Sequence, residues 1–424
     1  MSTMPPPTDR PAPDALPRRP QWGYQTSLWQ VGQPAFWVFI IILAAGIVFS
    51  IVLQANFAGL TPGGWALSWF LLLIYAVPVF IFVYVLDLYE REPLSLVIGA
   101  LLWGAFAATT LSILANQGWT LVVLDLFTAE TATRWVAALT APFTEEILKG
   151  VGVVLIYLIA RREIDDILDG FVYGAVVGLG FSVIEDVFYF VTQFGGEPGG
   201  VIQGFFVRVI ASGLYGHVLY SGLFGIGVAY FVSRRQEASP GKRLGMAALF
   251  ILAGMFAHFL WNSPLLDLYP REGLQDVGDY LQVILATTVK GLPFLAFVVL
   301  MIGLARRREH RWLRAALAGE VGREGLHPDE LRALESPSTR RRTRRDMAQR
   351  SGPLAGQTLK RLQKAQINLA MVATRTYDPD HPDLVRQRQY CKALRDWLIA
   401  HAGAGRTWVQ PAAGGRPPAG RSRF

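Results

Sequence analysis

One ten-residue stretch decides how this chain must fold: Ala141-Pro142-Phe143-Thr144-Glu145-Glu146-Ile147-Leu148-Lys149-Gly150. It lies inside the apolar run from Trp135 to Ala160, which is long enough to cross a membrane. Its two glutamates and its lysine would each cost roughly 2.5–3.5 kcal/mol at that depth on insertion scales. At about 100° per residue, the three charged side chains fall within one half of a helix. That face cannot point at lipid, so it must meet polar groups from the rest of the chain.

The composition is typical of a polytopic membrane protein. Of the 424 residues, 52% are hydrophobic and 17% are charged. The single cysteine, Cys391, excludes an intramolecular disulfide framework and a cysteine-based zinc site. The net charge of +8 is unevenly divided. Residues 306–424 hold 25 Lys and Arg against 11 Asp and Glu, a balance of +14, and residues 1–305 hold 15 against 21, a balance of −6.

We therefore expect an all-α, polytopic helical membrane protein in three parts. Residues 1–34 are a Pro-rich disordered arm with no signal peptide, 35–305 are the membrane domain, and 306–424 are a basic, partly helical tail. Trp119–Phe127 is too short to cross and is interpreted as an interfacial or re-entrant segment. Eight transmembrane helices are expected, at about 35–55, 66–86, 94–115, 135–160, 168–193, 205–232, 244–268 and 280–305.

Loop charges predict the orientation of these eight helices. With the N-terminus in the cytoplasm, the exterior loops carry only Arg134 and Arg271. The interior loops carry seven basic residues: Arg91, Arg161, Arg162, Arg234, Arg235, Lys242 and Arg243. This excess places both termini in the cytoplasm and the protein in the cell membrane.

The basic tail contains its own helical patterns. Residues 357–374 and 383–402 show helical spacing of apolar residues, separated by the turn Asp378–Pro382, and the last 20 residues are expected to be disordered. The cluster Arg340–Arg345 favours association of the tail with anionic lipid of the inner leaflet. The alternative is a dedicated regulatory or partner-binding domain.

Four of the expected spans carry polar side chains at depth. Counted from the outer end at about 1.5 Å per residue, these groups lie roughly 12–18 Å down, in one layer. Each histidine forms an i, i+4 pair with a second polar residue, so each pair shares one helix face. Such groups within a membrane indicate a functional site. The candidates are Glu145, Glu146, Lys149, Glu185, His217 with Ser221, and His258 with Asn262, whereas Asp186 is a weaker candidate because it points about 100° away from Glu185.

These residue types suit hydrolysis of an acyl bond. A carboxylate beside a histidine activates water, a second histidine with an asparagine donates to an oxyanion, and Lys149 keeps a neighbouring carboxylate ionised. Glutamate with two histidines also suits a catalytic zinc ion, although the H-E-x-x-H spacing is absent. A proton or ion transporter is a further alternative, but we find no internal repeat. We favour a metal-independent reaction with no cofactor.

The ordered motifs resemble a known family of intramembrane proteases, the PrsW family, over about residues 85–305. The motifs are Glu145-Glu146-x-x-Lys149, Phe181-x-x-x-Glu185, His217-x-x-x-Ser221 and His258-x-x-x-Asn262, and the loop Asp87–Pro93 is similar to an acidic stretch of long members. The family is related to the type II CAAX prenyl endopeptidases, which have His where this chain has Glu185.

The resemblance implies a glutamic-type peptidase in which Glu145 and Glu146 are the catalytic pair and the histidines position water or the oxyanion. It implies a membrane-anchored protein as substrate, such as an anti-sigma factor cleaved in a stress response, and no nucleic-acid partner. Because the superfamily also contains inert scaffold subunits, a catalytically inactive membrane scaffold remains an alternative.

Overall fold

The computed structural model describes residues 27–401, apart from 87–91, 162, 214, 236, 266–273, 324, 335, 376, 377 and 379. The described part is all helical, with one isolated bridge between Val321 and Leu326. The chain divides into two compact units: the membrane unit ends at Ala305, and the C-terminal unit begins at Arg306. Several features discussed above fall outside the described residues: most of the N-terminal arm, the loop Asp87–Arg91, Arg162, Arg271 and the last 20 residues.

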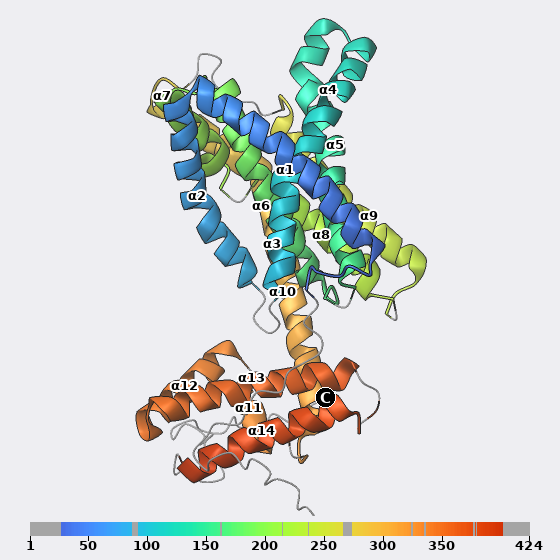
Figure 1. The fold of residues 1–424 in the computed structure, drawn as a ribbon, viewed down its shortest axis with the longest axis vertical. Helices are drawn as coiled ribbons and strands as arrows, with labels where there is room; N and C mark the ends of the chain where they lie inside the picture. The colour runs from blue at the N-terminus through green and yellow to red at the C-terminus, as the bar shows by residue number, and fades with distance from the viewer. Residues whose placement is uncertain are drawn as a thin grey trace, which may run out of the picture. The chain divides into compact units, whose positions relative to one another are not determined.

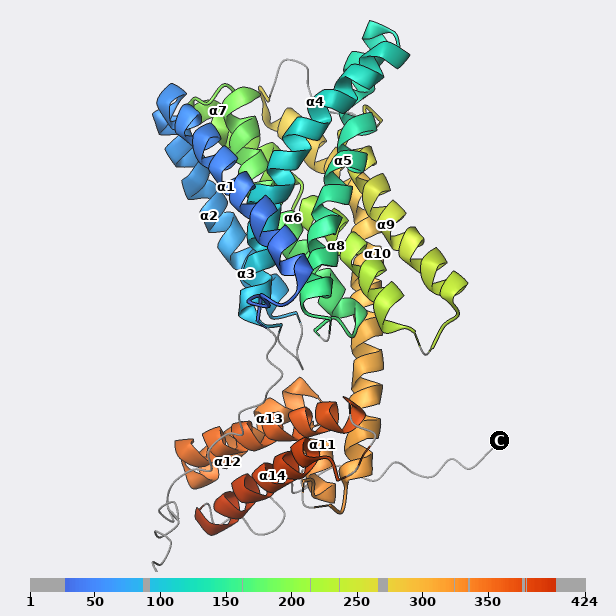
Figure 2. The ribbon, with the colours of Figure 1, turned by 45° about the vertical axis from the view of Figure 1, so that its right-hand side comes forward.

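The membrane unit is a bundle of long helices, several of which begin with proline in the first turn, where its missing N–H is not needed. Figures 1 and 2 show their arrangement. In chain order the elements are α1 (Pro34–Leu60), α2 (Pro62–Tyr84), α3 (Leu94–Leu102), the π-helix η1 (Trp103–Ala108), α4 (Thr109–Leu126), α5 (Ala129–Ile159), α6 (Ile167–Thr192), α7 (Pro198–Phe205), the π-helix η2 (Phe206–Ala211), α8 (His217–Ser233), α9 (Pro240–Asn262) and α10 (Val277–Glu320).

Within the described residues, six helical segments are long and apolar enough to cross a membrane, against the eight expected. The expected span 135–160 lies within α5, a helix of 31 residues. It is not among the six segments, because it contains the three charged residues Glu145, Glu146 and Lys149. The expected span 205–232 is broken, because η2 ends at Ala211 and α8 begins only at His217. The six segments are Pro34–Leu60, Pro62–Tyr84, Leu94–Leu126, Ile167–Thr192, Pro240–Asn262 and Val277–Glu320.

The interpretation of Trp119–Phe127 as a re-entrant segment is wrong, whereas its interfacial position stays a prediction. Residues up to Leu126 are the last turns of α4, which continues from α3 through η1 without a break. The error arose because Asn116, Gln117 and Gly118 lower the local hydropathy and mimic the end of a span. The continuous helix carries Asn116 toward the charged face of α5, as the site shows below.

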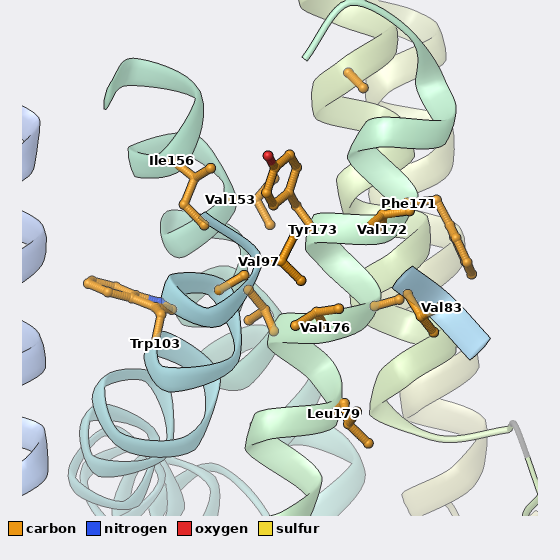
Figure 3. Close-up of a cluster of buried hydrophobic side chains, with 14 of the residues drawn as sticks. Val83, Val97, Trp103, Val153, Ile156, Phe171, Val172, Tyr173, Val176 and Leu179 are labelled. Carbon is orange, nitrogen blue, oxygen red and sulfur yellow. The ribbon is translucent and has the colours of Figure 1, made fainter. Parts of the chain in front are cut away.

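Helix α6 is the centre of the membrane unit. Of its most apolar stretch 94% is buried, against 28% for α1 and 17% for α2. It begins at a capping box, in which Asp166 and Asp169 satisfy backbone N–H groups of the first turn. One side packs against α3, η1 and α5, where Trp103, Val153, Tyr173 and Val176 form part of the hydrophobic core (Figure 3).

The other side of α6 meets α8 with the two backbones in contact. A Cβ atom added at Gly174 would lie 2.1 Å from the Ser221 carbonyl oxygen, and one at Gly178 would lie 2.1 Å from that of His217. Glycine is therefore required at these positions, because a methyl group would force the helices apart. We name this contact the α6–α8 seam, and it fixes the height at which α8 presents His217 and Ser221.

The C-terminal unit is a folded helical unit with its own apolar core, which includes the buried Cys391, Leu394 and Leu398. Two buried glutamates hold it together: Glu320 accepts two hydrogen bonds from Arg388, and Glu330 accepts two from Arg395. Such bidentate pairs fix geometry as well as charge. Its helices are the end of α10, then α11 (Pro328–Leu334), α12 (Pro337–Ser351), α13 (Pro353–Arg375) and α14 (Pro382–His401).

The seam gives a direct test of how the site is built. Gly178→Ala should lower both the melting temperature in detergent and the proteolytic activity, because the added methyl group collides with the His217 carbonyl. Gly245→Ala in α9 is the matched control, since nothing lies within 4 Å of its Cβ position and alanine favours a helix. Equal melting temperatures for the two variants would contradict the seam.

Candidate active site

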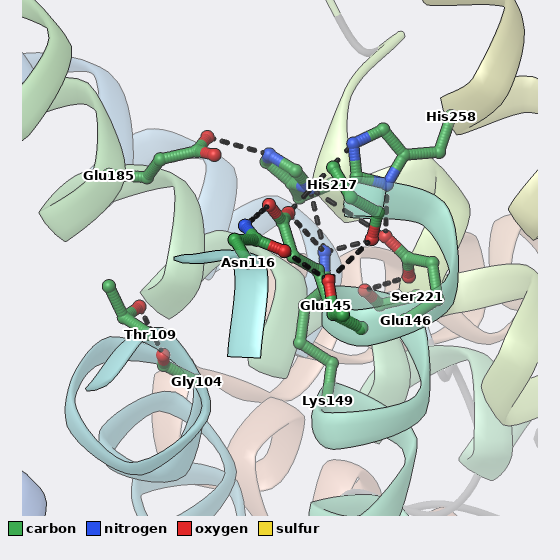
Figure 4. A network of polar contacts seen from close by, with 12 residues as sticks. Gly104, Thr109, Asn116, Glu145, Glu146, Lys149, Glu185, His217, Ser221 and His258 are labelled. Atoms are coloured by element: carbon green, nitrogen blue, oxygen red, sulfur yellow. Dashed lines mark hydrogen bonds and ion pairs between the residues drawn. The ribbon is translucent and has the colours of Figure 1, made fainter. Parts of the chain in front are cut away.

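The structure brings the eight main candidates, Ser221 included, into one connected polar network, and Figure 4 labels all of them except Asn262. Helix α5 supplies Glu145, Glu146 and Lys149, of which Glu146 and Lys149 are fully buried. The other residues come from three further helices: Glu185 from α6, His217 and Ser221 from α8, and His258 and Asn262 from α9. The spatial convergence expected from the sequence is therefore observed.

Glu146 is a buried anion whose two carboxylate oxygens both accept hydrogen bonds. The Lys149 ammonium lies 2.6 Å from Oε1, and His258 Nδ1 lies 2.9 Å from the same oxygen. The Ser221 hydroxyl donates to Oε2 at 3.0 Å. These donors offset the cost of burying the charge, and they tie α5 to α8 and α9.

His217 is the first residue of α8 and is held from both sides. The Lys149 ammonium lies 2.7 Å from its Nδ1, and Glu185 Oε2 lies 2.8 Å from its Nε2. An ammonium only donates and a carboxylate only accepts, so this arrangement requires a neutral ring with the proton on Nε2. The ring therefore has a defined tautomer, with its Nδ1 lone pair turned toward Lys149.

His258 has the opposite tautomer. Its Nδ1–H donates to Glu146, which leaves the Nε2 lone pair to accept from Asn262 Nδ2 at 3.2 Å. The ring also stacks on Tyr220, with a centroid separation of 5.0 Å. His258 Nε2 faces Glu145 Oε2 across 3.8 Å.

Glu145 differs from Glu146 in having an oxygen that no donor occupies. Its Oε1 accepts from Asn116 Nδ2 at 3.0 Å. Its Oε2 is buried and has no hydrogen-bond partner among the described residues. Glu145 Oε2 and His258 Nε2 therefore face each other, and a water molecule that replaced the Asn262 amide at Nε2 would donate to both atoms.

Sequence reasoning missed two polar residues that complete the network. Asn116 of α4 contacts Glu145, and Arg208 of η2 pairs with Glu185 at 2.6 Å and with Asp186. The signal for Arg208 was an arginine inside an expected span, which needs an acidic partner within the membrane. The signal for Asn116 was weaker, because an amide near a span end is ordinary. Asp186 joins the network indirectly, through the Arg208 side chain that it shares with Glu185.

A small cavity of about 20 Å³ adjoins His217. Its lining includes Ser182, Asp186, Arg208 and the backbone at Gly216, where the chain is unwound before α8. A polar space of that size holds about one water molecule. Water thus has a place beside the site although the surrounding helices are apolar.

The donor set also fits a divalent metal ion. Glu145, His217 and His258 each offer a ligand atom, and these atoms lie within 4.8 Å of one another. Each histidine directs its other ring nitrogen at a carboxylate, as metal-bound histidines usually do. The unpartnered Glu145 Oε2 supplies an anionic ligand. Lys149 would have to leave His217 Nδ1 for that nitrogen to bind a metal.

Comparison with known proteins gives consistent matches. Residues 92–304 match the model of the PrsW family intramembrane metalloprotease. The chain is 26% identical over 184 residues to Protease PrsW of Clostridioides difficile (strain 630), covering 43% of this chain and 72% of the relative. It is 23% identical over 201 residues to Protease PrsW of Bacillus subtilis (strain 168), covering 47% and 78%.

A third relative, Protease PrsW of Geobacillus kaustophilus (strain HTA426), is 28% identical over 213 residues, covering 49% of this chain and 78% of the relative. No solved structure matches the chain significantly. The matched region contains α3 to α9 and much of α10, and with them every residue of the buried glutamate and histidine network. The chain is a multi-pass membrane protein that belongs to the PrsW family of intramembrane proteases.

Proposed function

We propose that this protease cleaves peptide bonds of a membrane-anchored protein with a water molecule activated by Glu145. The observation that carries the proposal is the difference between the two adjacent glutamates. Glu146 accepts hydrogen bonds from Lys149, His258 and Ser221, whereas one buried oxygen of Glu145 accepts none from the part of the chain that the structure describes. A general base needs a free lone pair, so the base is assigned to Glu145.

The reaction uses the space between Glu145 Oε2 and His258 Nε2, which lie 3.8 Å apart. A water there donates one hydrogen to each atom and directs its own lone pair at the substrate carbonyl carbon. As the carbon–oxygen bond forms, Glu145 takes the water proton, and it then returns that proton to the leaving amide nitrogen. His258 aligns the water.

The remaining residues keep this pair in place. Glu146 holds the Nδ1–H of His258 and so turns its Nε2 toward the water. Lys149 neutralises Glu146 at 2.6 Å and lies 3.8 Å from Glu145, which favours the ionised base. Asn262 Nδ2 contacts His258 Nε2 at 3.2 Å in this structure; in the reaction it releases that lone pair to the water and is the proposed donor to the developing oxyanion.

A metal ion is the second proposal for the same residues, favoured by their grouping and by the description of the family as metalloproteases. Glu145, His217 and His258 would hold it. When bound, a metal would polarise the substrate carbonyl and make its bound water acidic. The glutamic type therefore stays a prediction. In favour of that type, the Lys149 ammonium already provides the cation next to Glu146 and His217.

The proposed substrate is a membrane protein that reaches the site from within the bilayer, an anti-sigma factor being one candidate. The buried position of the network favours a substrate segment that is itself lipid-embedded. We further propose that both termini are cytoplasmic and that the C-terminal unit contacts anionic lipid. Its helix α12 exposes Arg341, Arg342 and Arg345, and basic residues near such lipid gain about 1 kcal/mol each.

Substitution of the two glutamates should separate their roles. Glu145→Gln should lower kcat by about 10²–10⁴-fold while leaving the melting temperature in detergent unchanged, because only the base is lost. Glu146→Gln should be inactive and also less stable by about 3–5 kcal/mol, because Lys149 loses its closest anion. Glu130→Gln, on the exposed start of α5, is the matched control. An active Glu145→Gln enzyme would exclude Glu145 as the base.

A chelation experiment decides between the glutamic and the metal reaction. Purified protein in detergent should cleave a transmembrane peptide after treatment with a strong chelator, and elemental analysis should find less than one metal ion per chain. His258→Ala and His217→Ala should be nearly inactive and Asn262→Ala less impaired. Stoichiometric metal, with activity lost on chelation and restored by the ion, would establish the metalloprotease instead.

The proposed orientation is tested with reporter fusions and lipid binding. In the eight-helix topology, in which α5 and α8 also cross the membrane, fusions after Phe194 should report the exterior, and fusions after Arg235 or Arg350 the cytoplasm. A soluble fragment of residues 306–401 should bind vesicles containing anionic lipid and dissociate at high salt, because electrostatic attraction is screened. An exterior reporter signal from Arg350, or binding that ignores salt, contradicts the proposal.

A further inference from the structure

Asn116 lies on α4, and its side chain contacts the carboxylate of Glu145. Its Nδ2 donates to Glu145 Oε1 at 3.0 Å, and the hydroxyl of Thr144 donates to its Oδ1. We propose that Asn116, oriented by Thr144, is a positioning residue that holds Glu145 so that only Oε2 is offered to the hydrolytic water. This inference rests on the proposed role of Glu145 as the base.

The orientation of the Asn116 amide follows from its two neighbours. An ionised carboxylate only accepts hydrogen bonds, so the NH₂ end must face Glu145 Oε1. The Thr144 hydroxyl then meets the carbonyl end, to which it lies closer than to its other main acceptor, the Thr140 carbonyl at 3.1 Å. A reversed amide would place its oxygen against Glu145 Oε1, two acceptors face to face.

The contact matters because Glu145 has a competing partner. Its Oε2 lies 3.8 Å from the Lys149 ammonium, which is beyond hydrogen-bond distance but close enough for strong attraction in a buried site. A carboxylate released from Asn116 is free to close that gap. Oε2 would then be occupied by Lys149 and lost as a base. Asn116 thus keeps Glu145 separate from the cation that Glu146 binds.

Kinetics of three variants test the proposal on the full-length protein in detergent with a cleavable transmembrane peptide. Asn116→Ala should lower kcat by about 10–100-fold with little change in KM, because Asn116 acts through Glu145 and does not touch the substrate. Asn116→Asp should be at least as impaired, although it has nearly the same size, because it places a second acceptor against Glu145. A residue that only fills space would show the reverse order.

Thr144→Val removes the hydroxyl and should reduce kcat less than Asn116→Ala does. The double variant Thr144→Val/Asn116→Ala should be no slower than Asn116→Ala alone, because Thr144 acts through the amide. Gln117→Ala, on the exposed face of α4, and Thr133→Val, on the exposed part of α5, are the matched controls and should match wild type. Melting temperatures within a few degrees of wild type exclude misfolding.

The outcomes separate this inference from the proposed function. If Asn116→Ala and Asn116→Asp retain wild-type kcat while Glu145→Gln is inactive, Glu145 is the base but Asn116 does not position it, and the inference is wrong. If Glu145→Gln is active, the assignment of the base fails first. A raised KM with unchanged kcat in the Asn116 variants would assign Asn116 to substrate binding and overturn the positioning role.

Discussion

The contact between the Lys149 ammonium and Glu146 is the interaction on which the membrane unit depends. Neither side chain has any exposed surface, and they lie 2.6 Å apart on one helix. A buried pair of this kind is stable only when further groups satisfy its remaining donors and acceptors. His217, His258 and Ser221 do so, and each comes from a helix that must therefore pack against α5. The buried charges that prevent this face of α5 from meeting lipid thus also determine which helices pack against it.

Much of the site was predictable because membrane burial leaves few places for polar residues. Glu145, His217 and His258 were recognised as a group from depth and helix face alone, and they do lie together. The role of each glutamate was not predictable. It depends on which oxygen meets which donor, and that is decided by side-chain torsions and by Asn116, which lies 29 residues away on another helix.

The fold was predictable in class, whereas the number of eight membrane-spanning helices stays a prediction, because six of the described segments are long and apolar enough to cross. Apolar periodicity and loop composition identify long helices, and α6 and α9 begin close to where they were expected. Hydropathy cannot detect the break between Ala211 and His217, because the residues on both sides are apolar. Hydropathy also does not decide whether α5 crosses the membrane, because its apolar run contains Glu145, Glu146 and Lys149. Both features, the break before His217 and the charged residues of α5, lie at the site, where buried polar groups depart from the apolar pattern of a membrane helix.

The α6–α8 seam limits how this enzyme can change. At Gly174 and Gly178 the backbones of α6 and α8 are in direct contact, so there are no side chains between them that could repack. We therefore expect α6 and α8 to move as one rigid body, which would keep Glu185 and His217 together. Helix α9 also meets α8 at the backbone, because a Cβ atom at Gly254 would lie 2.5 Å from the Tyr220 carbonyl oxygen. Adjustment to substrates of different width is then left to α4, which reaches the site through the Asn116 side chain. The side of the site formed by α6 and α8 is therefore expected to be fixed, and the side formed by α4 is the part free to adapt.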